Sequence, residues 1–185
     1  MSDIQTLVEG YKKRTRNHGV KRNDESYRQC LEFTKSELER LLKMYEGMLE
    51  EDMTARLMRD SIDHHIRRYH DYAVRGKIGS HYREVGVIES QSIFEHVIPA
   101  SSVRDMLIEK RLTINQALNT PTCLIKKSQD IKLRQNGLSN TSPNNWNFFQ
   151  RYRVLGSQFT TNIGIPITDI ETWSLKDHND YFQIT

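Results

Sequence analysis

The fold of this chain is organised around one short stretch, Ser92-Ile93-Phe94-Glu95-His96-Val97-Ile98-Pro99. A run of aromatic and β-branched residues that stops at a proline is typical of a β-strand, because proline has no N–H to donate to a sheet. The strand carries a carboxylate, Glu95, next to an imidazole, His96. Side chains alternate along a strand, so these two groups can converge only where it bends or ends near Pro99. We therefore look for function at the end of this strand.

The residues before this strand predict helices. Thr34-Lys35-Ser36-Glu37 has the spacing of a capping box, and apolar residues follow it at helical intervals. A second apolar series continues to about Val74, where Arg75-Gly76-Lys77-Ile78-Gly79 interrupts the pattern. Asp52 fits an N-cap between the two series, which leaves open one bent helix or a helical hairpin. The apolar stripe over residues 34–74 suits either the protein core or the contact of a homodimer.

The residues after Pro99 predict an insertion, a second strand and a helix. Thr113-Ile114-Asn115-Gln116 has capping-box spacing and starts a short helix within the insertion. Thr122-Cys123-Leu124-Ile125-Lys126 has the composition of a strand. Ser128 then fits the N-cap of a helix that Gly137 stops. The order is strand, insertion, strand, helix.

Two further elements are expected beside this core. The β-prone stretch from Val85 to Ile88 predicts a strand that pairs antiparallel with the central one. Thr168-Asp169-Ile170-Glu171 has capping-box spacing, which predicts a final helix from Thr168 with Trp173 or Leu175 packing inward.

Three residues suggest a chemistry. His96 ends a strand, Asn119 follows in the insertion, and Asp130 lies in the first turn of the helix after the second strand. A histidine with a pKa near neutral can take a proton from water, and a divalent cation held by oxygen ligands stabilises a phosphate under attack. The combination favours hydrolysis of phosphodiester bonds.

The same residues carry a resemblance to a known family. Glu95-His96-Val97-Ile98-Pro99, with Asn119 and the helix start Lys127-Ser128-Gln129-Asp130, resembles the HNH group of ββα-metal (His-Me finger) endonucleases over roughly residues 80–155. The resemblance implies that His96 is the general base and that Asn119 orients it. It implies that Asp130 and Glu95, the acidic neighbour of the base, bind the metal.

The resemblance also implies Mg²⁺ or Mn²⁺ as the cofactor and DNA as the substrate, with RNA left open. Asn115 is an alternative to Asn119, and Gln129 is an alternative to Asp130 as the helix-borne ligand. The CxxC zinc knuckles common in the family are absent, since the two cysteines, Cys30 and Cys123, lie far apart.

Basic residues near these motifs are candidates for contacts with nucleic acid, and we assign that role to Lys126, Lys127 and Arg151, with Arg67 and Arg68 as further phosphate contacts. The aromatic segment around Arg151, from Trp146 to Tyr152, suits either base stacking or the core. The alternative hypothesis is a non-catalytic module that has the HNH-like scaffold and binds nucleic acid or protein.

The expected fold class is α+β, with an N-terminal helical region packed around a small ββα-metal core and C-terminal helices. We expect a basic arm at residues 1–28, a helical region at 29–79, the HNH-like core at 80–140 and a helical extension at 141–185, all in one compact unit. The composition of 36% hydrophobic and 28% charged residues, with a net charge of +3, suits a folded protein and permits a polyanionic partner.

The expected location is the cytoplasm. Two widely separated cysteines suggest a reducing compartment. No apolar run approaches the roughly 18 residues of a membrane span, and the first residues lack the apolar core of a signal peptide, so we expect no membrane partner.

Overall fold

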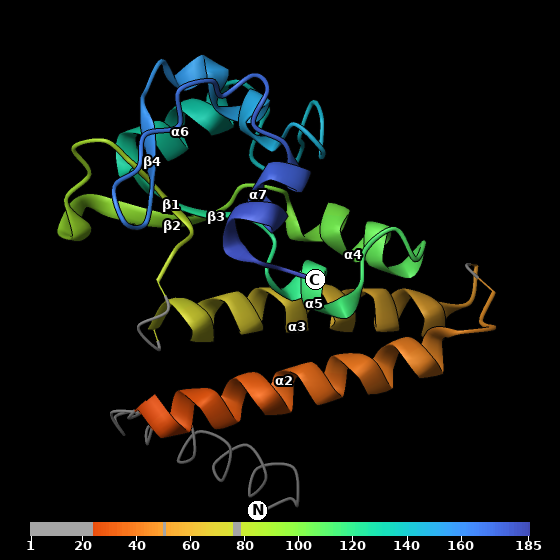
Figure 1. The fold of residues 1–185 in the computed structure, drawn as a ribbon. Helices are drawn as coiled ribbons and strands as arrows, with labels where there is room; N and C mark the ends of the chain where they lie inside the picture. Colours follow the sequence, from red (N-terminus) through yellow and green to blue (C-terminus); the bar gives the residue numbers. More distant parts are fainter. Residues whose placement is uncertain (1–23, 50, 76–78) are drawn as a thin grey trace, which may run out of the picture.

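A four-stranded mixed sheet with helices on both sides forms the centre of the computed structural model, which describes residues 24–49, 51–75 and 79–185 (Figure 1). The predicted α+β fold class is confirmed. The basic arm expected at residues 1–28 lies almost wholly outside the described residues. No helix within the described ranges has both the length and the apolar composition that a membrane span requires.

Helices α2 (Asp24–Tyr45) and α3 (Met53–Arg75) form an antiparallel hairpin below the sheet in Figure 1. The hairpin is therefore the correct alternative of the two that the sequence left open. Asp52 stands where a cap was expected, and its carboxylate accepts a hydrogen bond from the backbone N–H of Thr54 at 2.8 Å.

The predicted start of the first helix at Thr34 is wrong, because α2 begins at Asp24. The Thr34 side chain is 2% exposed, and its hydroxyl donates to the carbonyl of Cys30 at 2.6 Å. A threonine inside a helix can satisfy its hydroxyl in this way instead of capping. Much of the apolar stripe that follows, with Leu38 and Leu41, is buried in the core, whereas Leu49 and Leu57 are exposed.

The sheet consists of β1 (Tyr82–Glu84), β2 (Ser92–His96), β3 (Thr122–Lys126) and β4 (Phe159–Thr161), in the order β2-β3-β1-β4. Strand β2 pairs antiparallel with β3, and β1 pairs parallel with β3 and antiparallel with β4. The two strands of the predicted core are therefore direct neighbours.

The strand predicted at Val85–Ile88, antiparallel to the central strand, is wrong in place and in partner. The strand lies earlier, at β1, and β3 separates it from β2. Gly86 has a φ of +72°, which turns the chain just after β1, and Val85 and Ile88 are exposed. The β-branched residues that suggested a strand belong to this turn and the loop after it.

The remaining helices follow the predicted order. The insertion between β2 and β3 holds α4 (Ala100–Ile108) and α5 (Ile114–Leu118), and α6 (Lys127–Gln135) follows β3 directly. The capping box at Thr113 is confirmed, since its hydroxyl and the side chain of Gln116 exchange hydrogen bonds with each other's backbone N–H groups. Short 3₁₀ helices η1 (Glu89–Gln91) and η2 (Phe148–Leu155) complete this part.

The last helix, α7 (Leu175–Phe182), begins seven residues after the predicted start at Thr168. Ser174 caps it in a capping box with Asp177. The carboxylate of Asp169 instead accepts the backbone N–H of Glu171 in a turn, so the same pattern forms a local bend there. Leu175 packs inward, as expected.

One continuous hydrophobic cluster joins the helical hairpin, the insertion, the sheet and the C-terminal residues. In Figure 1, α6 lies above the sheet and α3 below it. The aromatic segment of η2 belongs to this core, because Phe148, Phe149 and Tyr152 are fully buried. Base stacking by these rings is thereby excluded in the folded protein.

Candidate active site at the end of strand β2

A polar cavity of about 330 Å³ lies at the end of β2, where the strand meets α6, α3 and the start of α4. Its charged and polar lining includes Arg67, Glu95, His96, Asp130, Arg134 and Asn140. The cavity thus brings together four residues that the sequence singled out, from three separate elements: two from β2, one from α6 and Arg67 from α3.

Glu95 is 15% exposed, and its carboxylate lies 2.6 Å from the guanidinium of Arg151. Burial raises the pKa of Glu95, the positive charge of Arg151 opposes that rise, and the negative charge of Asp130 adds to it. The two carboxylates are therefore close enough to repel each other. A cation between them would relieve this repulsion.

Asp130 lies in the first turn of α6, where the helix dipole favours a negative charge. Its carboxylate pairs with Arg134 one turn later, at 2.6 Å, and is 15% exposed. Among the described residues, no group of three or more His, Cys, Asp or Glu side chains could hold a metal. Two carboxylates suit Mg²⁺ or Mn²⁺ better than zinc, because Mg²⁺ is usually held by one or two carboxylates together with water and phosphate oxygens.

His96 is the last residue of β2, and its imidazole is partly buried beside Phe94 and His70, with ring centroids 5.2 and 5.0 Å away. Burial lowers the pKa of His96 to about 4, the positive charge of Arg67 adds to this, and Asp63 opposes it. The ring is therefore neutral at pH 7. Its Nε2 is buried without a hydrogen-bond partner in the described part of the chain. His96 lines the cavity, and a buried polar atom without a partner needs an explanation; a role as proton acceptor is one.

Asn119 does not join this site. It follows α5 directly, and its side-chain amide donates to the carbonyl and side-chain oxygens of Asn115 at 2.8 and 3.1 Å. The alternative, Asn115, is exposed and donates to the carbonyl of Thr185. Neither lines the cavity among the residues that the structure describes there. The insertion packs α5 against the helical hairpin and α4.

Arg151 has a structural position, which corrects the expectation that it contacts nucleic acid. Its side chain is fully buried. The guanidinium donates to four backbone carbonyls, those of His96, Val97, Leu138 and Ser139, at 2.7 to 3.2 Å. Together with its ion pair to Glu95, these bonds connect η2 to the end of β2 and to the loop after α6.

Lys126 and Lys127 lie at the opposite end of the strand pair from His96. The antiparallel register places Lys126 opposite Ser92, and Thr122 opposite His96, which separates Lys126 from the His96 end by roughly 13 Å along the strand. The Lys126 ammonium lies 3.2 Å from the Glu84 carboxylate, and the Lys127 ammonium donates to the carbonyl of Ser90. Any contact they make with nucleic acid lies outside the cavity.

Glu84 explains why Lys126 is held in this place. Its side chain is 1% exposed, and it accepts hydrogen bonds from the backbone N–H of Lys126 and the hydroxyl of Ser157, both at 2.8 Å. Burial would raise the pKa of Glu84, but these hydrogen bonds and one from Gln129 outweigh it and lower the pKa. The side chain of Gln129, the alternative metal ligand, thus belongs to the hydrogen-bond network around Glu84.

Arg134, Ser139 and Asn140 are the polar cavity residues that the sequence analysis did not select. The i, i+4 spacing of Asp130 and Arg134 on a predicted helix was the available signal for Arg134. Asn140 lies on the loop after α6 and has no comparable pattern. Arg67, which was expected to contact phosphate, does line the cavity, and it pairs with Asp63 at 2.7 Å.

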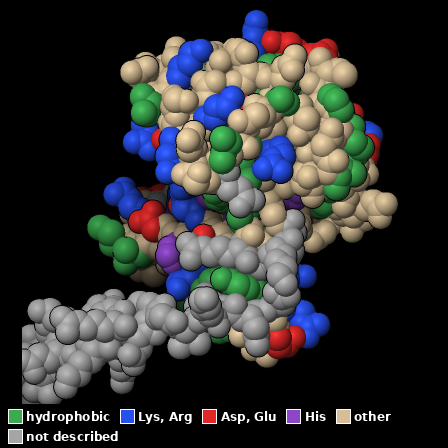
Figure 2. Space-filling model, turned by 90° about the vertical axis from the view of Figure 1, so that its left-hand side faces the viewer, with side chains coloured by type: hydrophobic (Ala, Val, Ile, Leu, Met, Phe, Trp, Pro, Cys, Tyr) green, Lys and Arg blue, Asp and Glu red, His purple; other side chains and the backbone are tan. Residues whose placement is uncertain are grey.

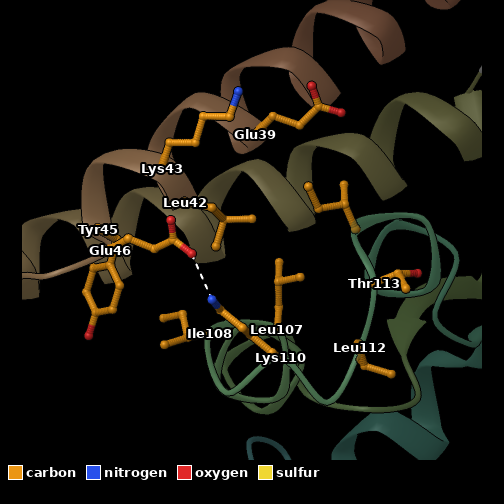
Figure 3. Close-up of a pocket in the computed structure, with 11 residues that line it drawn as sticks. Glu39, Leu42, Lys43, Tyr45, Glu46, Leu107, Ile108, Lys110, Leu112 and Thr113 are labelled. Carbon is orange, nitrogen blue, oxygen red and sulfur yellow. Dashed lines mark hydrogen bonds and ion pairs between the residues drawn. The ribbon is translucent and has the colours of Figure 1, made fainter.

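A second and larger cavity, of about 450 Å³, opens between α2 and the α4–α5 region (Figure 3). Leu42, Leu107 and Ile108 give it apolar walls, and an ion pair between Glu46 and Lys110, at 2.9 Å, spans it. Its described lining contains no imidazole or thiol. Of these two cavities, the one at the end of β2 is therefore the one with an imidazole in its described lining.

Three other histidines near the sheet predict a pH-dependent stability: His70 and His178 are buried, and His81 is half-buried. Burial is the main cause that lowers the pKa of His81 to about 4, of His178 to about 3 and of His70 well below its ordinary value. Between pH 6.5 and about 4 the unfolded chain binds more protons than the folded one, so stability is lost as pH falls through this window.

We expect the free energy of unfolding to fall between pH 7 and pH 4.5 by about 2 to 3 kcal/mol each for His81 and His178, with His70 adding to the fall in the same direction. Urea unfolding at several pH values measures the change. His64→Gln should leave this fall in stability unchanged, because His64 is exposed. His81→Asn should make the fall smaller. A free energy of unfolding that stays constant from pH 7 to pH 5 would contradict the prediction.

Comparison of the chain with models of protein families, with curated proteins and with solved structures finds no match.

Proposed function

We propose that the protein is a divalent-metal-dependent endonuclease that hydrolyses the phosphodiester bonds of DNA. The observation that carries this proposal is the cavity at the end of β2, which joins the strand-end pair Glu95 and His96 to the first-turn carboxylate of α6, Asp130. His96 and Asp130 are two of the three residues from which the sequence suggested phosphodiester hydrolysis, and Glu95 is the acidic neighbour that the resemblance implies; the third residue, Asn119, does not line the cavity.

The local topology supports the proposal. Strand β2 is antiparallel to β3, and α6 follows β3 without an intervening loop. Two antiparallel strands and a helix in this order are what the resemblance to ββα-metal endonucleases implies. The insertion of residues 97–121 between the strands contains α4 and α5 and leaves the pairing of β2 with β3 intact.

Each residue of the cavity has a distinct part in the proposed reaction. His96 is neutral at pH 7 and takes a proton from the attacking water. Glu95 and Asp130 hold the cation, which supplies positive charge to the phosphate and the leaving oxygen when bound. Arg67 and Arg134 add positive charge on two sides of the phosphate.

The surface is compatible with a polyanionic substrate. Figure 2 shows Lys and Arg side chains spread over the upper part of one face of the molecule, with fewer acidic side chains among them. The net charge is +3. Cys30 and Cys123 are both free thiols, which is in keeping with the cytoplasmic location that we propose.

The test is cleavage of supercoiled plasmid with Mg²⁺ or Mn²⁺ and with EDTA, comparing the wild type with Asp130→Asn. We expect metal-dependent nicking that the variant reduces by about 100-fold or more. Asp60→Asn is the matched control, because Asp60 is exposed on α3. Nicking that persists in EDTA, or an Asp130→Asn variant as active as the wild type, would refute the metal site. A parallel RNA substrate decides between the two nucleic acids.

The ion pairs of the cavity favour one rival. Glu95 and Asp130 are each paired with an arginine, so the site could bind phosphate through its arginines without a cation. Under this rival, binding of an oligonucleotide would be unchanged by EDTA and would weaken steeply with salt, and no cleavage would occur.

A further inference from the structure

We propose that Arg134 is an exchangeable counter-charge, which neutralises Asp130 while no cation is bound and turns to the substrate phosphate when a divalent cation binds Asp130. This inference rests on the proposed function, because it assigns a step of metal and substrate binding to the same cavity. It makes Arg134 a substrate-binding residue whose contribution depends on the metal.

The two arginine–carboxylate pairs of the cavity differ in how firmly they are held. Arg151, the partner of Glu95, is fully buried and donates to four backbone carbonyls. Arg134, the partner of Asp130, has a side chain that is 64% exposed, and in the described part of the chain the hydrogen bond to Asp130 is the one that it makes. Only the second pair can open without breaking the fold.

The cost of opening follows from this contrast. An exposed i, i+4 pair on a helix is weak, because solvent screens the charges and both side chains lose rotamer freedom in it. Moving Arg151 would take a donor from four backbone carbonyls and the counter-charge from the largely buried Glu95 carboxylate. Glu95 and Asp130 would hold the cation, and of their two arginine partners Arg134 would then give way while Arg151 would stay in place.

The released guanidinium remains at the cavity, because α6 fixes the Cα atom of Arg134 one turn from Asp130. Arg67 approaches the same cavity from α3. A planar guanidinium binds a phosphate through two parallel N–H donors, which gives both charge and orientation. Arg134 is thus available to phosphate only after the cation has taken its former partner.

The first experiment measures Mn²⁺ affinity in the absence of nucleic acid, by isothermal titration calorimetry on the full chain. Arg134→Gln should bind Mn²⁺ about two- to fivefold more tightly than the wild type, because its competitor for Asp130 is gone. Arg67→Gln is the matched control: it removes the same charge from the same cavity, but Arg67 pairs with Asp63. It should tighten Mn²⁺ binding by clearly less than Arg134→Gln.

The second experiment measures oligonucleotide binding in the His96→Ala background, which prevents cleavage. With Mn²⁺, Arg134→Gln should weaken binding by about three- to tenfold, the loss of one phosphate contact. In EDTA the same substitution should change the affinity for the oligonucleotide less than about twofold, since Arg134 is then paired with Asp130.

Two results would overturn the exchange while leaving the proposed function standing. One is an equal Mn²⁺ affinity of Arg134→Gln and Arg67→Gln, which would mean that removing either positive charge from the cavity has the same electrostatic effect on the cation. The other is an Arg134→Gln effect on oligonucleotide binding that is the same with Mn²⁺ and with EDTA. A wild-type protein that binds no Mn²⁺ with or without oligonucleotide would overturn both the exchange and the metal-dependent nuclease.

Discussion

His96→Ala is expected to lower the rate of phosphodiester cleavage by about 10²- to 10⁴-fold at pH 7.5, the range of a lost general base. The imidazole is neutral at this pH, and its Nε2 has no partner in the described structure, so it can accept a proton from water at the cavity. Nicking rates of supercoiled plasmid, measured at saturating Mg²⁺, give the effect.

The controls separate catalysis from folding. His64→Ala changes an exposed histidine on α3 and should cleave at the wild-type rate. His96→Ala should keep the wild-type circular dichroism spectrum and bind an oligonucleotide within a few-fold of the wild type, since binding relies on other groups. A His96→Ala variant that folds and retains normal turnover would remove His96 from the reaction.

Arg151→Ala is expected to destabilise the fold by about 3 to 5 kcal/mol, as measured by urea unfolding. The substitution leaves Glu95 buried without its counter-charge, and it leaves four backbone carbonyls without their side-chain donor. A typical domain has only about 5 to 15 kcal/mol of stability, so a large fraction of the variant could be unfolded at 37 °C.

Two variants calibrate this prediction. Arg153→Ala removes an arginine whose side chain is 63% exposed and paired with Glu171, and it should cost less than about 1 kcal/mol. Arg151→Lys keeps the charge but cannot reach all the carbonyls from one ammonium, so its cost should lie between the other two. If the free energy of unfolding of Arg151→Ala lies within 1 kcal/mol of the wild-type value, the guanidinium does not hold the end of β2.

The capping boxes show how far a local pattern can be trusted. The pattern at Thr113 forms as expected, because the chain is free to start a helix there. At Thr34 the helix has already begun at Asp24, and the hydroxyl bonds within it. At Thr168 the chain turns instead, and α7 starts at Leu175. The pattern supplies side chains that can cap, but neighbouring packing decides whether a helix end exists.

The candidate site divides in the same way. Glu95, His96 and Asp130 could be chosen from the sequence because each stands at the end of a strand or the start of a helix, and adjacent elements bring such ends together. Asn119 belongs to an insertion whose packing direction no local pattern reveals. Arg151 illustrates the opposite error, since a basic residue among aromatics can be either a surface contact or a buried anchor.

Local sequence was sufficient for the α+β class, for the order strand, insertion, strand, helix, and for the two residues at the end of β2, since these depend on hydrophobic periodicity and on a single proline. The strand order β2-β3-β1-β4, the burial of Arg151 and the presence of Arg134 in the cavity depend on tertiary structure. They result from contacts between residues up to about a hundred positions apart, such as the pairing of β1 with β4. Such contacts are chosen by the packing of the whole core and leave no periodic trace in any one segment.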